Sequence, residues 1–456
     1  LLYSDLAYQT PGGITKVQYD ENPALARQPG GPFPGAIDQK TAIYNKSFFA
    51  GLSHEYQWNE KWSNRTGIYG AFTQFENPFI NNYEKRIEQS FGGRTNFQYE
   101  FSKGKWNVGA ELQHGFSPIS VYDNNAGITG DLQNSDEVTS DASFVFSQIE
   151  FFILKNFSLT AGASLNFFSI RYVRLSDVPP FIQRKKIDPV ISPRVALLKK
   201  LSDHISLYGS ISRGFAPPTV AELYPSTSTF NNDLNPEEGI NFEIGGRSTM
   251  LNNRLVFDVT AYSFHLNETI TVRRNDAGND YFVNAGKTSQ RGLEFQGSWQ
   301  SSHLPRNLIS NFKIWSALSL NHYRFADYVQ DTVEFSNNKL TGVPSVVSVS
   351  GIDLSTKLGI YTNLTITYTD EIPLNDANTV FADAYLLAGG RIGYRNTFRK
   401  KFSLDIFAGI DNALNEPYSL GNDLNAFGGR YFNAAAPRNF YAGFTAGFDF
   451  GRRKYE

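Results

Sequence analysis

The segment FYAGFTAGFDF, residues 440–450, decides the fold because two kinds of side chain alternate strictly along it. Its apolar residues are Phe440, Ala442, Phe444, Ala446, Phe448 and Phe450. The residues between them are Tyr441, Gly443, Thr445, Gly447 and Asp449. A period of two places these sets on opposite faces of a β-strand. An apolar face that ends in aromatics, opposite a small or polar face, suits a strand with lipid outside and water inside. The segment therefore predicts a membrane β-barrel.

The composition agrees with a β-structure. Aromatic residues make up 15% of the 456 residues, there are 38 glycines, and the mean hydropathy is -0.35. Aromatic side chains favour strands. No uninterrupted apolar run reaches the roughly 20 residues of a transmembrane helix, so a membrane location has to come from alternating strands. The formal charge of -2 gives no reason to expect nucleic acid. Cysteine is absent, which excludes disulfides, thiolate metal sites and a cysteine nucleophile.

The connections between the alternating segments are of two kinds. Tight turns are predicted at Asn59-Glu60, Ser102-Lys103-Gly104, Lys155-Asn156, Ser202-Asp203-His204, Leu251-Asn252-Asn253 and Ser355-Thr356-Lys357, with 301–309 as the longest of the turns. Longer polar segments rich in Gly, Pro and Asn are predicted as loops at 11–39, 77–87, 118–139, 176–187, 215–238, 326–338, 371–380 and 413–437. We count about 18 strands, the first at Leu1 to Thr10 and the last at Phe440 to Phe450.

Alternation of short and long connections is typical of an all-β, antiparallel, up-and-down transmembrane barrel with periplasmic turns and external loops. A large soluble β-sandwich or solenoid also has alternating strands, but does not place all its long loops at one end. In the barrel, Leu255, Phe257, Phe444 and Phe448 are expected to face outward. The C-terminus is expected on the periplasmic side.

Three segments resemble TonB-dependent receptor barrels. The first is ISRGFAPPTVAELYPSTSTFNNDLNPEEGINFEIGGR, residues 211–247, with a Gly-Phe-x-x-Pro-Thr turn and an Asn-x-x-Leu-x-Pro-Glu segment before a strand that contains a Glu. The second is YFVNAGKTSQRGLEFQGSWQ, residues 281–300, with Asn-x-Gly followed by Arg-Gly-x-Glu. The third is GIDNALNEPY, residues 409–418, with PRNFYAGFTAGFDF, residues 437–450, which resembles the closing hairpin of the family. In addition, residues 10–27 and 76–86 resemble external loops of ferric citrate and siderophore receptors of the Bacteroidetes type.

The resemblance implies a function and its partners. Such receptors lie in the Gram-negative outer membrane, in contact with its lipid, and import a ferric siderophore or ferric citrate-like complex. Their energy comes from the TonB-ExbB-ExbD complex through a plug that precedes a barrel of about 22 strands. Residues 1–456 are then expected to form the barrel domain, without the plug and about four first strands. An open sheet would leave unpaired edges in hydrocarbon, so we expect a fragment that transports nothing by itself. A passive porin or adhesin barrel is the alternative.

An enzyme is not expected, although a barrel lipase or protease is the third class of protein considered. The histidines, which are the commonest general bases, are scattered along the chain: His54, His114, His204, His265, His303 and His322. None has the spacing of a helical zinc site or a plausible Ser and Asp partner nearby. We therefore predict no catalytic residue, no cofactor and no protein metal ligand, since a chelator would carry the iron.

Ligand contacts are expected from external-loop residues with planar charge or an aromatic surface. The candidates are Arg27, Gln28, Tyr83, Arg86, Tyr224, Arg273, Arg274, Arg430 and Tyr431. Arginine can grip the carboxylates of ferric citrate in bidentate geometry, and tyrosine can stack on catecholate rings. Arg27, Arg86 and Arg430 are the candidates for a clamp on an anionic chelate. The alternative is that rim Arg and Tyr residues anchor the barrel at the lipid headgroups.

Overall fold

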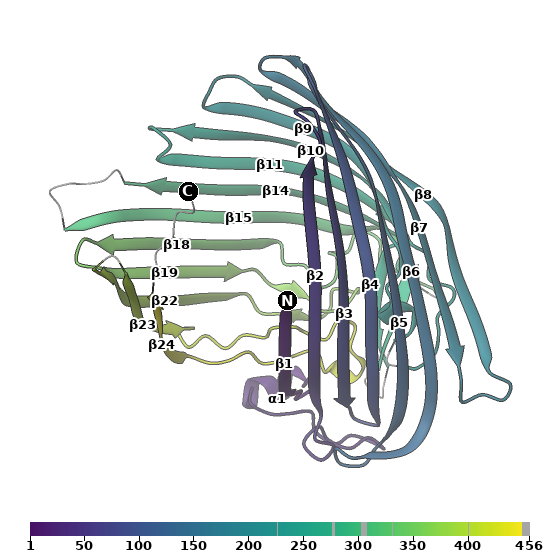
Figure 1. The fold of residues 1–456 in the computed structure, drawn as a ribbon. Helices are drawn as coiled ribbons and strands as arrows, with labels where there is room; N and C mark the ends of the chain where they lie inside the picture. The colour runs from purple at the N-terminus through teal and green to yellow at the C-terminus, as the bar shows by residue number, and fades with distance from the viewer. Residues whose placement is uncertain (226, 276–278, 302–307, 331, 400, 449–456) are drawn as a thin grey trace.

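The computed structural model is described for residues 1–456 except 226, 276–278, 302–307, 331, 400 and 449–456. One antiparallel sheet of 18 strands dominates it (Figure 1). Its strands are β1 (Leu2–Gln9), β2 (Ala42–Gln57), β3 (Trp62–Pro78), β4 (Asn82–Phe101), β5 (Gly104–Asn124), β6 (Thr129–Leu154), β7 (Phe157–Arg174), β8 (Phe181–Lys200), β9 (Ile205–Ala216), β10 (Glu237–Met250), β11 (Leu255–Asn267), β14 (Lys287–Gln300), β15 (Ile309–Asp327), β18 (Val346–Thr356), β19 (Ile360–Thr369), β22 (Tyr385–Phe398), β23 (Phe402–Asp411) and β24 (Asn439–Phe448).

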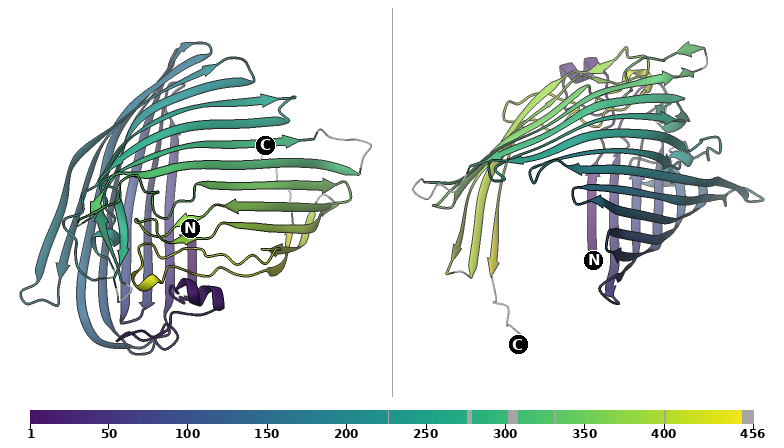
Figure 2. Two further views of the ribbon diagram at one scale, coloured as in Figure 1. Left: turned by 180° about the vertical axis from the view of Figure 1, so that it is seen from behind. Right: turned by 90° about the horizontal axis from the view of Figure 1, so that it is seen from above.

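Each strand of the large sheet pairs with the next one along the chain, from β1 to β24. This is the predicted up-and-down order, and the predicted count of strands is confirmed. Within the described residues β1 and β24 do not pair with each other, so the sheet is curved but open (Figure 2, right). The end of the predicted last strand, at 449–450, and the turn region 302–307 lie outside the described residues.

The remaining elements are short and belong to the connections at one end of the sheet. They are the hairpins β12 (Ile270–Arg274) with β13 (Asp280–Asn284), β16 (Val329–Gln330) with β17 (Val333–Glu334), and β20 (Ile372–Pro373) with β21 (Phe381–Ala382), and the helices α1 (Lys16–Glu21), α2 (Val220–Leu223) and η1 (Phe427–Gly429). Among the described residues, no helix has both the length and the apolar character needed to cross a membrane.

Three of the predicted long loops are wrong. Strands β3 and β4 are joined by residues 79–81, β5 and β6 by 125–128, and β7 and β8 by 175–180. Most of 77–87 and 118–139, and the end of 176–187, are therefore paired strand. Polar residues can occupy these strand extensions because a hairpin that continues beyond the lipid no longer has to present an apolar face to it. The reverse error is a missing loop: 268–286, which contains the β12–β13 hairpin.

The two faces of the sheet have the expected characters. Phe444 and Phe448 are 75% and 55% exposed, and Leu255 and Phe257 are partly exposed and lie outside the buried hydrophobic clusters. On the opposite face, the Tyr208 hydroxyl donates to Asp258 at 3.1 Å. That polar face continues across β19, β22 and β23, where Tyr361 and Arg395 donate to Asp405. The apolar face is the one that suits lipid, and the polar face suits a water-filled lumen.

The buried hydrophobic residues gather at the loop end. One cluster packs the ends of β5–β7 against the 217–236 connection, around Tyr172 and Leu223. Another joins the first and last loops through Ile14 and Phe432, and a third surrounds Phe325. The loop end is thus a packed layer, and this layer positions the site described next.

Candidate functional site

Three arginines surround a cavity of about 320 Å³ at the loop end, which we call the arginine cavity. They are Arg27 from the first loop, Arg274 from the tip of β12 and Arg430 from the last loop. Asp423 is the one acidic residue of the lining. The other lining residues are Tyr8, Gln9, Thr10, Pro11, Gly12, Gly13, Phe79, Asn275, Phe427 and Asn433.

The first and last loops are held together by backbone hydrogen bonds. The amide of Ile14 donates to the carbonyl of Phe432 at 2.9 Å, and the amide of Phe432 donates back at 3.1 Å. Beside this bridge Tyr19 stacks on Phe432, with ring centroids 5.2 Å apart. Tyr19 is placed by α1, whose first turn is fixed by a capping box between Thr15 and Gln18. These contacts join the two segments that carry Arg27 and Arg430.

Glycine allows these loops to approach closely. A Cβ atom at Gly13 would collide with the carbonyl oxygen of Arg430 and with the Asp423 carboxylate. A Cβ atom at Gly30 would lie 2.6 Å from a guanidinium nitrogen of Arg430. A larger residue at Gly13 would meet the backbone of the last loop and force the two loops apart, whereas at Gly30 it would displace the Arg430 side chain. The absence of a Cβ atom at Gly13 and Gly30 therefore lets charged groups from distant segments lie close together.

Positive charge exceeds negative charge in the arginine cavity. Its lining carries three guanidinium groups and one carboxylate, a formal charge of +2 (three minus one). Arg274 pairs with Asp423 and with Asp280, at 2.7 Å from Nε to Oδ1 for the latter. Arg27 is 6% exposed, and its pKa is lowered by burial and then by the charges of Arg430 and Arg274. The site thus holds like charges together in a partly desolvated space, which an anion would relieve.

Asp423 is the counter-charge inside the cavity. Burial raises its pKa above the ordinary value, and the charge and hydrogen bond of Arg274 oppose that rise. The Asn433 amide also donates to Oδ1, at 3.2 Å. Asp423 therefore occupies a position on Arg274 that an anionic ligand could take.

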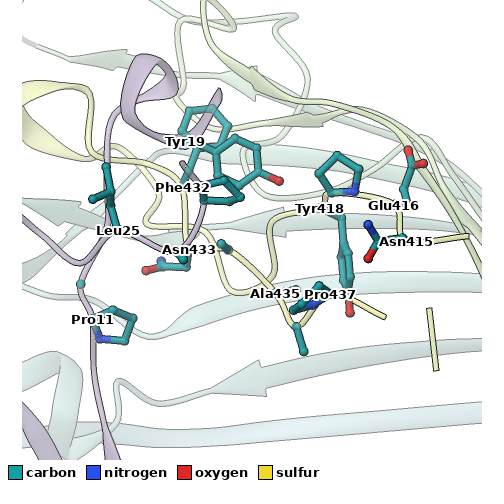
Figure 3. Close-up of a pocket in the computed structure, with 16 residues that line it drawn as sticks. Pro11, Tyr19, Leu25, Asn415, Glu416, Tyr418, Phe432, Asn433, Ala435 and Pro437 are labelled. Carbon is teal, nitrogen blue, oxygen red and sulfur yellow. The ribbon is translucent and has the colours of Figure 1, made fainter. Parts of the chain in front are cut away.

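A second cavity of about 380 Å³ adjoins the arginine cavity, and we call it the apolar cavity (Figure 3). It lies between the same first and last loops, with Tyr19, Leu25 and Phe432 on one side and Tyr418, Ala435 and Pro437 on the other. Glu416 is the one charged residue of its lining. The remaining lining residues are Pro11, Gly12, Pro23, Ala24, Asn415, Pro417, Asn433, Ala434 and Ala436.

The structure brings Arg27, Arg274 and Arg430 together and places the other candidates elsewhere. Tyr431 packs, partly buried, against the cluster around Ile14 and Phe432. Gln28 is exposed, and its side-chain amide donates to the carbonyl of Ala26 at 2.9 Å. Neither of these two residues lines the arginine cavity.

Arg273 points into a buried polar network. It is 6% exposed and donates to the hydroxyl of Tyr328, to Gln330 at 2.8 Å and to the Asp376 carboxylate. Asp376 also accepts from Thr341 and from the Asn425 amide, the latter at 3.1 Å. The network joins the β12–β13 hairpin to the 328–345, 370–384 and 412–438 connections, so the role visible here is structural.

Tyr83, Arg86 and Tyr224 are likewise engaged by the protein. Tyr83 donates to Glu76 at 2.7 Å, at the end of the β3–β4 hairpin. Arg86, on β4, forms ion pairs with Glu84 at 3.2 Å and Glu88 at 2.9 Å and lies over the Phe75 ring. It does not line the arginine cavity.

Tyr224 lies in the cluster that anchors the 217–236 connection. It is 6% exposed and its hydroxyl donates to the Asp136 carboxylate. Burial, and then this hydrogen bond, raise the pKa of the hydroxyl, which keeps it a neutral donor. Tyr172 and Arg174 bond to the same carboxylate, at 2.8 Å and 3.0 Å.

Sequence reasoning missed Asp423, Asp280 and the role of the apolar cavity. A signal for the missed hairpin was present, since residues 275–280 read NDAGND, a run of turn formers between two strands. No comparable signal marked Asp423, because its partner Arg274 is distant in the sequence. Among the described residues, no cluster of three or more His, Cys, Asp or Glu side chains has the arrangement of a metal site.

Comparison with known proteins places the chain in a family. Residues 2–413 match the family described as TonB dependent receptor-like, beta-barrel. The fold is similar to that of the ferric citrate transporter FecA in its unliganded form, with a TM-score of 0.77 at 15% identity over 98% of this chain and 66% of that one. It is also similar to the ferric yersiniabactin uptake receptor FyuA from Yersinia pestis, with a TM-score of 0.72 at 13% identity over 98% of this chain and 67% of that one.

A third similar structure is the siderophore receptor PiuA from Acinetobacter baumannii, with a TM-score of 0.72 at 13% identity over 98% of this chain and 70% of that one. The chain thus spans about two thirds of the length of these structures. All three are named as receptors or transporters and none as an enzyme. Since the family match covers most of the sequence, the chain belongs to the TonB-dependent receptor-like β-barrel family.

Proposed function

We propose that residues 1–456 are the barrel domain of an outer-membrane receptor that takes up a ferric siderophore or a ferric citrate-like complex. The observation that carries this proposal is the arginine cavity, where three guanidinium groups from distant segments meet at the loop end of a TonB-dependent receptor barrel. Ferric citrate and hydroxy-acid siderophores present carboxylate oxygens. Arginine is well suited to such oxygens because its planar fork donates two parallel hydrogen bonds.

The charge balance of the arginine cavity supports an anionic ligand. Arg27, Arg274 and Arg430 outnumber Asp423 in the lining, and burial together with the neighbouring charges of Arg430 and Arg274 makes the positive charge of Arg27 costly. A ferric chelate with net negative charge lowers that cost when it binds. The chelator carries the iron, so the protein supplies hydrogen-bond donors and positive charge but no metal ligand.

The energy for uptake is proposed to come from the inner-membrane TonB complex through a plug, as the family resemblance implies. On this proposal the receptor lies in the outer membrane of a Gram-negative bacterium, with the apolar face of the sheet in lipid. Growth on ferric citrate as the iron source tests it in cells that carry the full-length receptor. Growth should stop when the energy complex is deleted, and growth that continues would contradict active uptake.

The binding test compares arginines inside and outside the arginine cavity. In the full-length receptor, Arg27→Ala, Arg274→Ala and Arg430→Ala should each weaken ferric citrate binding by about 1.5–3 kcal/mol, or roughly ten- to hundredfold, because a charged hydrogen-bonding partner is lost. Arg86→Ala is the matched control and should bind normally, because Arg86 is paired with Glu84 and Glu88 on β4.

Binding is measured by calorimetry, and heat-modifiable gel mobility reports whether the barrel has folded. Normal binding by all three cavity variants would overturn the proposed arginine site. A lost mobility shift in these variants would instead support the alternative that the arginines anchor the barrel.

A further inference from the structure

We infer that the ligand is an anionic chelate with an apolar group, whose anionic part lies in the arginine cavity and whose apolar part lies in the apolar cavity. This inference rests on the proposed function and adds a ligand class to it. A ferric citrate complex without an apolar group would fill the arginine cavity alone.

The two cavities share part of their walls. Pro11, Gly12 and Asn433 line both of them. The same two loops, the first and the last, supply most of the residues on either side of this shared wall, and the Ile14–Phe432 bridge holds the loops in register. The two cavities are therefore neighbours that meet at these three residues, within reach of one ligand.

The apolar cavity has walls suited to hydrocarbon or an aromatic ring. Tyr19 and Phe432 form a stacked pair of rings in the lining. The lining residue Tyr418 packs at a tilt against Tyr385, which does not line the cavity, with centroids 5.0 Å apart. Leu25 packs against the buried cluster behind the first pair. Removing apolar ligand surface from water against such walls is favourable in proportion to the area buried.

Charge gives the ligand one orientation. The arginine cavity carries a formal charge of +2, whereas the one charged lining residue of the apolar cavity is the acidic Glu416. A carboxylate placed in the apolar cavity would meet like charge and lose hydration without an arginine to replace it. The anionic part of the ligand is therefore directed to Arg27, Arg274 and Arg430, and the apolar part away from them.

The test uses two iron(III) complexes of citrate monoamides that differ only in the amide substituent, methyl in one and hexyl in the other. Each additional methylene that is fully buried tightens binding roughly fourfold, so burial of only two of the five added methylenes gives about fifteenfold. We expect the hexyl complex to bind the full-length receptor at least about tenfold more tightly than the methyl complex.

Variants then locate the hexyl group. Ala435→Trp fills the apolar cavity, and Leu25→Gln makes its wall polar at similar volume. Both should remove the preference for hexyl while binding of the methyl complex persists. Ala221→Trp is the matched control, because Ala221 is an exposed residue of α2 outside both cavities, and it should keep the preference.

The possible failures are distinguishable. Equal binding of the two complexes by the unmodified receptor would overturn this inference and leave the proposed function standing. Binding of neither complex would count against the proposed function itself. A hexyl preference that survives in both Ala435→Trp and Leu25→Gln would show that the apolar group lies elsewhere and would overturn the assignment. If Ala435→Trp also weakens binding of the methyl complex, Leu25→Gln decides.

Discussion

Two groups of arginines at the loop end differ in the number of carboxylates that lie beside them. In the first group each arginine forms an ion pair: Arg86 with Glu84 and Glu88, Arg174 with Asp136, and Arg273 with Asp376. The lining of the arginine cavity, by contrast, carries three guanidinium groups and one carboxylate, that of Asp423, which pairs with Arg274. Asp280 is a further partner of Arg274. The first group tightens the fold. The second group lines a cavity in which guanidinium groups outnumber carboxylates, and that difference separates the arginines with a structural role from those proposed to bind the ligand.

The residue type alone does not reveal this difference. Arg273 and Arg274 are adjacent in the sequence, and successive side chains of a strand point to opposite sides. One joins the buried network around Asp376 and the other lines the arginine cavity. Neighbours in one hairpin can therefore have opposite roles, and substitutions at each should give different readouts.

The largest effect is expected from Asp376→Ala. The Asp376 carboxylate accepts hydrogen bonds from Arg273, Thr341 and Asn425. Its removal leaves the buried Arg273 charge without its ion-pair partner. Breaking a buried pair from one side costs about 3–5 kcal/mol. We expect faster hydrogen exchange in residues 268–286 and 370–384, with the barrel still folded by gel mobility. Asp383→Ala is the control, since its pair with Lys16 is exposed and is worth about 0–1 kcal/mol. Equal effects of the two substitutions would refute the distinction.

Tyr224→Phe should have the next largest effect. It removes a buried hydroxyl that donates to Asp136, and a hydrogen bond to a charged group contributes about 1.5–3 kcal/mol. Limited proteolysis should cut the 217–236 connection more readily, while ferric chelate binding is retained. Tyr281→Phe, at a more exposed position on β13, is the matched control. A loss of chelate binding with an unchanged proteolysis pattern would mean that Tyr224 is a ligand contact after all.

Arg430→Lys separates charge from geometry in the arginine cavity. Lysine keeps the positive charge but loses the planar fork, so we expect ferric citrate binding to weaken by roughly three- to tenfold, less than for Arg430→Ala. Arg86→Lys should leave calorimetric binding unchanged. If lysine at position 430 binds as tightly as arginine, the contact is a simple charge and the bidentate grip is wrong.

Asp423→Asn should have the smallest effect, in the opposite direction. Because Asp423 competes with an anion for Arg274, its neutralisation should tighten ferric citrate binding about two- to fivefold. Protonation acts in the same sense: burial raises the pKa of Asp423, so lowering the pH neutralises it before an ordinary aspartate and should strengthen binding.

The pH dependence of the effect of Asp423→Asn on ferric citrate affinity checks this prediction. The ratio of affinities between the Asn variant and the unmodified receptor should fall towards one as the pH falls. Comparing the two proteins at each pH cancels the titration of citrate itself. A ratio that does not change with pH would contradict the assigned competition.

The sequence predicted the sheet well because strand alternation is a local property. The outward side chain of Phe444 and the lumen position of Asp405 both follow from a period of two, and each can be read within ten residues. Loop boundaries were less predictable: Asn134 and Asp136 are polar residues typical of loops, yet they lie within β6. Both are buried, and Asp136 accepts hydrogen bonds from Tyr172, Arg174 and Tyr224, so their polarity serves contacts within the protein that no local pattern distinguishes from a loop.

The sequence predicted the type of residue that forms the site, but not which of the arginines form it. Arginines in external loops were the expected groups, and Arg27, Arg274 and Arg430 do lie together. The partner Asp423 lies 149 positions after Arg274 (423 minus 274), so no local pattern connects them. Arg86, which the sequence grouped with Arg27 and Arg430, is held on β4 by neighbouring glutamates. Which arginine lines the cavity depends on contacts that form only in the folded chain.

The bridge between Ile14 and Phe432 also sets an order of events during folding. These residues are 418 positions apart (432 minus 14), so their two hydrogen bonds close a loop that comprises nearly the whole chain. Contacts of such sequence separation form late, because the entropy of closing the loop is lost before the contact stabilises anything. On the proposed function, the ligand site would thus be the last part of this sheet to assemble. A barrel stalled during insertion would expose lipid-facing strands but present no assembled ligand site to the cell exterior.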